Sequence, residues 1–116
     1  MFLSKYEFSN VIKNTPLVAI DLCIVKGNEL LLGKRINAPA KNFFFVPGGR
    51  ILKSEPKEIA LKRILKNELG LKNKDKKENY LKSLGCYEHF YDDNFFDNKT
   101  FGTHYVVLAY CLNYRF

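Results

Sequence analysis

The chain contains no tryptophan, a single methionine and only three cysteines, Cys23, Cys86 and Cys111. The cysteines are isolated and no CxxC pair occurs, so the sequence indicates neither a zinc site nor a disulfide framework. No apolar run approaches the roughly 20 residues that a membrane-crossing helix needs. The N-terminal MFLSKYEF carries charge too early for a secretion signal. We therefore expect a reduced, cytoplasmic protein that has no membrane partner.

Acidic residues are in the minority, with 12 Asp and Glu against 19 Lys and Arg, which gives a formal net charge of +7. A basic balance favours anionic partners such as nucleotides or phosphosugars, although a lysine-rich solvated surface would explain the charge equally well. Many lysines cluster in residues 72–82, where Tyr80 is the one aromatic residue, so the segment lacks the repeated interleaved aromatics suited to base stacking. This pattern argues against a nucleic-acid partner.

The 116 residues suffice for a single domain, residues 1–116, and 47% of them are hydrophobic. Ser4 followed by Glu7 predicts a capping box before a helix over 5–13. Strands are predicted over 17–25, 29–35, 43–46, 81–90 and 103–114, and a second helix over 56–69, ended by Gly70. A sharp turn is predicted at 47–49 and an acidic loop at 91–99. The pattern predicts a mixed sheet with helices, α+β or α/β in class.

The second helix combines apolar residues with one notable carboxylate. Ile59, Leu61, Leu65 and Leu69 are its predicted core contacts. Glu68 faces the negative end of the helix dipole, an unfavourable place that costs roughly 0.3–1 kcal/mol. Coordination of Mg²⁺ would offset that cost, but an exposed glutamate paired with a nearby lysine explains Glu68 as well.

Further residues, one of them in this helix, could bind a diphosphate or brace its site. Arg35 and Arg50 could form forked contacts to phosphate oxygens, although each alone is more often an ordinary surface arginine. Arg63 could pair with Glu55 and brace the turn, or it could be solvated. Gly48 and Gly49 would let the backbone approach a ligand, with carbonyls able to ligate a hard cation.

The joint spacing of these residues resembles the Nudix box, GX5EX7REUXEEXGU, in which U is aliphatic. The residues of this chain that match the motif are Gly49, Glu55, Arg63, Leu65, Glu68, Gly70 and Leu71. Ile64 and Asn67 stand where the pattern has glutamates, so this chain keeps one of three clustered carboxylates. One carboxylate with backbone carbonyls suits a single Mg²⁺ per active site.

Five ordered segments extend the resemblance to the GDP-mannose mannosyl hydrolase branch of that family. They are TPLVAIDLCIV, LLGKR, FVPGGR, HFYDDNF and THYVVL. The resemblance implies a Nudix fold, with a mixed sheet between helices, in a C-terminally shortened homodimer that lacks the last strand and helix. It also implies Mg²⁺-dependent hydrolysis of GDP-mannose or a related GDP-sugar, by water attack at the anomeric carbon with inversion.

The resemblance also implies roles for individual residues. Arg35 would contact the diphosphate, with Arg50 near the phosphates, and Tyr105 would donate a hydrogen bond to the leaving GDP. Mg²⁺ would bind Glu68 and the carbonyl of Gly48 or Gly49. Asp21 and His89 would lie beside the nucleotide-sugar, and Glu55 and Arg63 would be structural. Arg35, Tyr105 and His89 are the residues that we expect to take part in catalysis, with the general base itself not identified.

The family's Gln-His pair, which follows the THYVVL strand and supplies the general base, has no counterpart before Phe116. His89 and His104 are the two histidines; His104 reads as a packed core residue, and His89 is not an evident replacement base. Two alternatives therefore stay open. The chain could bind a nucleotide-sugar without turning it over, or it could be an ordinary Nudix diphosphatase that cleaves a P–O bond.

Overall fold

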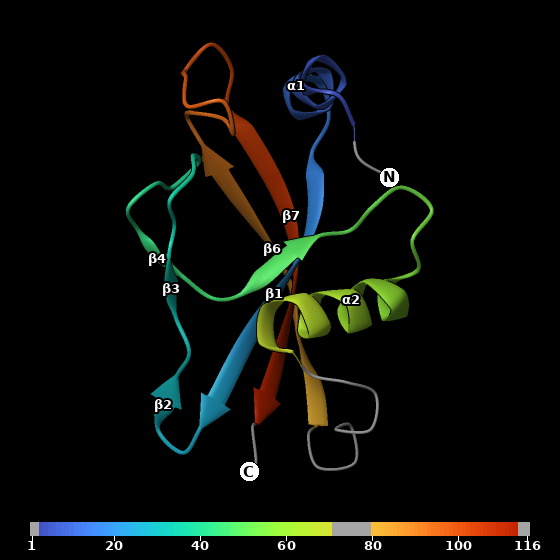
Figure 1. Cartoon of the computed structure of the whole chain (residues 1–116), viewed down its shortest axis with the longest axis vertical. Coiled ribbons are helices and arrows are strands. Elements are labelled where there is room, and N and C mark those ends of the chain that lie inside the picture. The colour runs from blue at the N-terminus through green and yellow to red at the C-terminus, as the bar shows by residue number, and fades with distance from the viewer. Residues whose placement is uncertain (1–2, 71–79, 114–116) are drawn as a thin grey trace.

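The computed structural model describes residues 3–70 and 80–113 (Figure 1). Leu71 of the motif, most of the lysine-rich segment and the expected strand end at 114 lie outside these residues. The elements in chain order are α1 (Lys5–Asn14), β1 (Leu17–Lys26), β2 (Glu29–Leu30), β3 (Gly33–Lys34), β4 (Phe44–Phe45), β5 (Gly48–Arg50), α2 (Lys57–Leu69), β6 (Tyr80–Tyr91) and β7 (Thr103–Asn113).

The first helix begins with the predicted capping box. The Glu7 backbone N–H donates to the Ser4 hydroxyl at 3.1 Å, and the Ser4 N–H donates to the Glu7 carboxylate at 3.2 Å. Two N–H groups that have no partner inside the helix are thereby satisfied. Ile12 is buried, and α1 lies at the end of the sheet where β1 begins (Figure 1).

The main sheet is mixed and is built around β1. Its order is β2-β1-β7-β6, and β5 also pairs with β1. β1 and β7 are parallel, with Ala19 opposite Val107, whereas β2 and β5 run antiparallel to β1. β6 pairs antiparallel with β7. The predicted mixed sheet with two helices is therefore confirmed.

The predicted strand over 29–35 is wrong in its continuity. The chain forms the short β2 and leaves the main sheet after Leu31, whose N–H still donates to the Ile24 carbonyl at 3.0 Å. It then forms β3, which pairs with β4 in a separate two-stranded sheet. Gly33 permits this pairing because a Cβ there would lie only 3.3 Å from the ring of Phe45. The small sheet lies beside the main one, on the left in Figure 1.

One face of β1 forms the core. Successive strand residues point to opposite faces, so Ile20, Leu22 and Ile24 share a face and all are buried there. They pack with Leu112 of β7 against α2. Burying such a side chain contributes about 1.5–3 kcal/mol each, so this face supplies much of the stability.

The helix α2 presents Ala60, Leu61 and Ile64 to that core, with Leu65 packed beside them. The predicted core contacts of Leu61 and Leu65 are thus confirmed. The predicted core contact of Ile59 is wrong, because the Ile59 side chain is 49% exposed. The buried stripe is centred on Ile64, at 2% exposure, and so Ile59 is rotated outwards. The predicted contact of Leu69 lies outside the described side chains.

The predicted sharp turn at Pro47-Gly48-Gly49 is also wrong, since Gly48–Arg50 form the strand β5. Gly48 lies opposite Asp21 in the pairing with β1. A Cβ at Gly48 would clash with the Ile20 carbonyl oxygen. The glycine is therefore required by the close approach of two strands and not by a turn.

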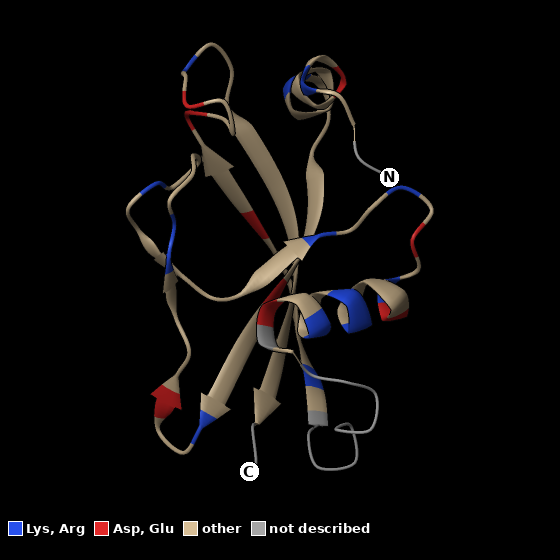
Figure 2. Cartoon of the chain, in the orientation of Figure 1, with Lys and Arg blue, Asp and Glu red and all other residues tan. Residues whose placement is uncertain are grey.

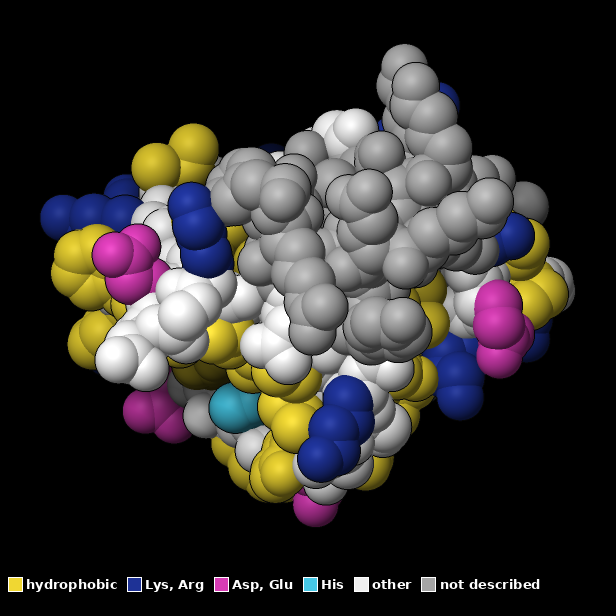
Figure 3. Space-filling view, turned by 90° about the horizontal axis from the view of Figure 1, so that it is seen from below, with side chains coloured by type: hydrophobic (Ala, Val, Ile, Leu, Met, Phe, Trp, Pro, Cys, Tyr) yellow, Lys and Arg dark blue, Asp and Glu magenta, His cyan; other side chains and the backbone are white. Residues whose placement is uncertain are grey.

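Charge is spread over the surface. Described Lys and Arg residues occur on both helices, on several strands and in the loops (Figure 2). From below, hydrophobic side chains are visible between isolated charged ones (Figure 3). Within residues 3–70 and 80–113, no helix is long and apolar enough to cross a membrane.

Candidate active site

A pocket of about 450 Å³ opens on the face of the sheet opposite α2. The walls come from β1, β5, β6 and β7 together with the β3–β4 segment, α1 and the loop 92–102. Its lining includes every predicted substrate-binding residue: Asp21, Arg35, Arg50, His89 and Tyr105. Gly48 and Gly49 line it as well. Strand alternation therefore gathers residues that are far apart in the sequence.

Asp21 lies in the floor of this pocket because it alternates with the buried Ile20 and Leu22. Its side chain is half-buried, and it has no hydrogen-bond partner among the described residues. Burial raises the pKa of the Asp21 carboxyl group, and the nearby His89 partly opposes that rise. A half-buried carboxylate beside an imidazole is suited to binding hydroxyl groups of a ligand.

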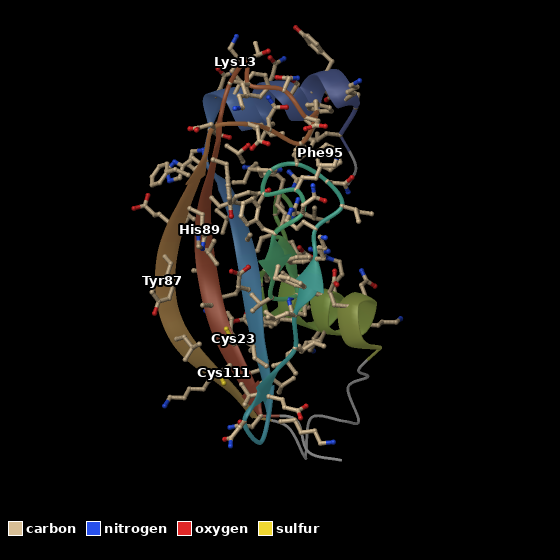
Figure 4. All side chains as sticks on the ribbon, turned by 90° about the vertical axis from the view of Figure 1, so that its left-hand side faces the viewer. Lys13, Cys23, Tyr87, His89, Phe95 and Cys111 are labelled. Carbon is tan, nitrogen blue, oxygen red and sulfur yellow. The ribbon has the colours of Figure 1, made fainter. Side chains whose placement is uncertain are left out.

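Tyr105 of β7 lies opposite His89 of β6 in the antiparallel register. Burial raises the pKa of the Tyr105 hydroxyl, although the neighbouring Arg35 lowers it in part. The phenol is therefore protonated at neutral pH and can donate a hydrogen bond into the pocket. Figure 4 shows His89 on the strands and Phe95 nearer to α1.

Tyr91 is a pocket residue that sequence reasoning missed. Its ring stacks with that of His89 at 6.4 Å and meets the ring of Tyr105 edge-on at 6.2 Å. Burial raises the pKa of its hydroxyl. The signal was available in the sequence, because a residue two positions beyond His89 in a strand must face the same side.

Arg35 is held in place by the loop that follows it. Its Nε donates to the carbonyl oxygens of Pro39 at 2.6 Å and Asn37 at 3.2 Å. Its guanidinium also lies over the ring of Phe45, 5.6 Å from the centroid. These contacts occupy one edge of the guanidinium and leave the other for an anionic ligand.

Arg50 lines the same pocket as Arg35 and stacks on Phe8 of α1, 4.5 Å from the ring centroid. Its backbone carbonyl accepts a hydrogen bond from Arg63 Nη2 at 2.7 Å. This hydrogen bond ties the helix α2, which carries Arg63, to the strand β5, which carries Arg50.

Arg63 and Glu55 form the ion pair that was one of the two interpretations of Arg63. Arg63 Nε donates to Glu55 Oε2 at 2.8 Å, and Nη2 donates to Oε1 at 3.0 Å. The hydrogen bonds from Arg63, together with one from the Leu52 N–H, lower the pKa of Glu55 to about 2. Arg63 of α2 thus holds both the Glu55 carboxylate and the Arg50 carbonyl of β5. These contacts brace the segment between β5 and α2.

The backbone carbonyl groups of Gly48 and Gly49 point in different directions. The Leu22 N–H donates to the Pro47 carbonyl, and the Ile51 N–H donates to that of Val18. The alternation of an antiparallel ladder then directs the Gly49 carbonyl at β1 and the Gly48 carbonyl away from it. Of the two, Gly48 has the carbonyl oxygen that is free for a cation.

Glu68 does not line the pocket and is exposed on the last turns of α2. Ile64, at a motif position for glutamate, is buried in the core. Among the described residues no group of three or more His, Cys, Asp or Glu could hold a metal. The donors that the resemblance implies, the Glu68 carboxylate and a glycine carbonyl, do not make a multi-metal cluster, and Gly48 lines the pocket whereas Glu68 lies outside it.

His104 lies on the other face of β7 from Tyr105. It pairs with Glu88 at 2.8 Å and stacks on Phe90 at 4.3 Å. The prediction of a packed core residue is wrong, because the His104 side chain is 34% exposed. The sheet edge at β6 leaves this part of the face open.

Two arginines beside a carboxylate, an imidazole and a phenol make a pocket for a phosphorylated, hydroxyl-bearing ligand. The sequence profile of the NUDIX domain matches residues 15–114. The chain belongs to the Nudix family of hydrolases, and its mixed α+β architecture is the Nudix fold.

Three individual comparisons agree with that assignment. The chain is 36% identical over 104 residues to the low-salt glycan biosynthesis protein Agl8 of Haloferax volcanii, covering 90% of this chain and 63% of that protein. It is 46% identical over 56 residues to an ADP-ribose pyrophosphatase of Methanocaldococcus jannaschii, covering 48% and 33%. A crystal structure of a MutT NUDIX hydrolase from Burkholderia pseudomallei matches with a TM-score of 0.63 at 27% identity, covering 87% and 69%. The chain thus spans less than two thirds of the length of either curated relative.

Proposed function

We propose that the protein hydrolyses a GDP-sugar, GDP-mannose in the first instance, to GDP and the free sugar. The observation that carries this proposal is the gathering of Asp21, His89 and Tyr105 in one pocket with two arginines. Guanine and mannose as the particular groups come from the resemblance of the five sequence segments. The likeness to a glycan biosynthesis protein is in keeping with a sugar-bearing substrate.

The pocket divides by chemistry into two parts. Arg35 and Arg50 supply fixed guanidinium groups for the two phosphates, because each is stacked on an aromatic ring. Asp21 and His89 supply polar groups for the sugar. This division would leave the anomeric carbon between the floor and the arginines.

The proposed reaction is attack of water on the anomeric carbon with inversion. The new bond joins the water oxygen to that carbon, and the bond from the carbon to the β-phosphate oxygen breaks. Negative charge then develops on GDP, where Arg35, Arg50 and the Tyr105 hydroxyl would stabilise it. Mg²⁺ is implied by the family resemblance and would neutralise further charge on the diphosphate; of its implied ligands, Gly48 lies at the pocket.

We assign to His89 the role of the general base, which accepts the proton of the attacking water. It is the histidine that lines the pocket, and a histidine side chain is the most frequent general base in enzymes. The nearby Asp21 carboxylate would stabilise the imidazolium that results. This role revises the interpretation from the sequence, which left the base unassigned.

Cleavage of a P–O bond is the competing reaction, and the likeness to an ADP-ribose pyrophosphatase favours it. The loss of carboxylates at Ile64 and Asn67 argues against it, since a diphosphatase of the multi-metal kind needs them to hold its metals.

Incubation of the purified protein with GDP-mannose and Mg²⁺, followed by chromatography of the products, tests the proposal. GDP with free mannose is the expected result. GMP with mannose 1-phosphate would refute C–O cleavage and establish the diphosphatase. Binding of GDP-mannose by calorimetry without any product would instead identify a nucleotide-sugar binding protein.

A further inference from the structure

An aromatic wall, formed by Phe8, Phe95 and Phe96, stands at the α1 end of the pocket. The rings of Phe8 and Phe95 meet edge-on at 5.7 Å, and those of Phe95 and Phe96 at 5.5 Å. Phe8 and Phe95 line the pocket, whereas Phe96 does not. Phe95 is 47% exposed, so its ring is accessible from the pocket that it lines.

The loop that carries Phe95 is fixed by one buried residue. Asn94 is fully buried, and its Nδ2 donates to Asn98 Oδ1 at 2.8 Å and to the Phe101 carbonyl at 3.1 Å. Its Oδ1 accepts from the Phe96 N–H at 2.9 Å. Such a satisfied polar network holds the backbone on either side of Phe95 in one conformation.

Further contacts tie the same loop to the sheet. The Thr103 hydroxyl donates to the Asp93 carbonyl at 2.8 Å, and the Asn94 N–H donates to the Asn98 carbonyl at 3.1 Å. An exposed phenylalanine on a rigid loop loses little conformational entropy on binding. It is thus a preorganised surface and not a side chain that must first be ordered.

The position of this wall relative to Arg50 points to what it binds. Arg50 lies over Phe8, whose ring in turn touches Phe95. A phosphate held by Arg50 would therefore lie close to the aromatic wall, while the sugar-binding groups Asp21 and His89 lie in the floor. An aromatic wall in this place is suited to a planar group that is attached to the phosphates and can stack on it.

We propose that Phe95 is the stacking platform for the nucleobase of a nucleoside diphosphate and that Asn94 is the residue that positions it. This inference rests on the proposed function and adds which part of the ligand occupies which wall. The base lies on Phe95, the diphosphate lies between Arg35 and Arg50, and the sugar lies over Asp21 and His89.

Calorimetry with GDP and with inorganic pyrophosphate, both in the presence of Mg²⁺, isolates the base. The wild-type protein should bind GDP more tightly than pyrophosphate. Phe95→Ala should weaken GDP binding by about 5- to 150-fold, the measured range for one base on one aromatic ring, and leave pyrophosphate binding unchanged. Phe95→Trp should retain the preference for GDP.

Phe43→Ala is the matched control, because Phe43 is exposed and does not line the pocket. It should leave the ratio of the two affinities unchanged. Asn94→Ala should lower that ratio, as Phe95→Ala does, because the ring is no longer held; an effect on folding alone would weaken both ligands equally.

Equal affinity of the wild-type protein for GDP and pyrophosphate would overturn the inference. Equal weakening of both ligands in Phe95→Ala would overturn it too. Because the readout is nucleotide binding and not turnover, it stands apart from the proposed reaction. A protein that binds GDP through Phe95 but leaves GDP-mannose intact would contradict only the reaction.

Discussion

The two faces of β1 share one strand backbone but have different roles, one in the core and one in the pocket. On one face Ile20, Leu22 and Ile24 are buried against α2 and the core. On the other, Asp21 lies in the floor of a pocket that the other strands fill with polar and aromatic groups. Because side chains alternate along the strand, the residues on one face contribute to stability and those on the other face form the pocket. Variants on the two faces should therefore have separable effects, which pairs of like residues can test.

The two histidines give the largest expected difference. His89→Gln should lower kcat by about 10²- to 10⁴-fold, the usual contribution of a general base, with little change in GDP affinity. His104→Gln, on the opposite face, should leave kcat nearly unchanged. Steady-state kinetics with GDP-mannose measures both. Equal activity of the two variants would remove His89 from the mechanism.

Two isoleucines of α2 test the buried face. Ile64→Ala should reduce the free energy of unfolding by about 2–5 kcal/mol, because it leaves a cavity at a residue that is 2% exposed. Ile59→Ala removes the same atoms from a half-exposed position and should cost less than about 1 kcal/mol. Urea unfolding measures both values. A cost for Ile59→Ala that matched that of Ile64→Ala would show the helix to be rotated from the orientation described.

The two glycines of β5 differ in the space around them. Gly48→Ala should destabilise at or above the upper end of the usual overpacking cost of about 1–3 kcal/mol, because its Cβ would meet a backbone oxygen. Gly49→Ala should cost less, since its Cβ would meet the flexible Ile64 side chain at 3.2 Å. Thermal unfolding compares them. The reverse order would contradict the pairing of β5 with β1.

Glu55 gives the smallest effect, a change in pH dependence. Its folded pKa of about 2 is below the unfolded value of about 4.3, so its stabilising contribution is present above pH 4.3 and is lost as the pH falls towards 2. Glu55→Gln should flatten the fall in unfolding free energy over this window. Glu58→Gln should keep it, because the Glu58 side chain makes no hydrogen bond or ion pair with another residue in the described ranges 3–70 and 80–113. Urea unfolding at several acidic pH values distinguishes the two variants.

Much of the fold could be predicted from local patterns. The Ser4–Glu7 capping box, the strand over 17–25 and the Gly70 helix end each depend on neighbouring residues, and the structure confirms all three. Gly48 and Gly49 were assigned to a turn because glycine is common in turns. The reason for Gly48 is instead a close approach to Ile20, a residue far away in the sequence.

The pocket was predicted in part, and the difference has a physical cause. Asp21, Arg35 and Tyr105 follow from resemblance to a known family. Phe95 and Asn94 do not, because their value depends on a loop conformation fixed by hydrogen bonds within residues 93–103. A buried asparagine in an acidic loop has no sequence signature that separates it from a solvated one.

The proposed site of bond cleavage can be tested most directly in ¹⁸O-labelled water. Hydrolysis of GDP-mannose there should place the label in the released mannose and leave GDP unlabelled, as mass spectrometry would show. Label in a phosphate group, with GMP as the nucleotide product, would contradict attack at the sugar carbon.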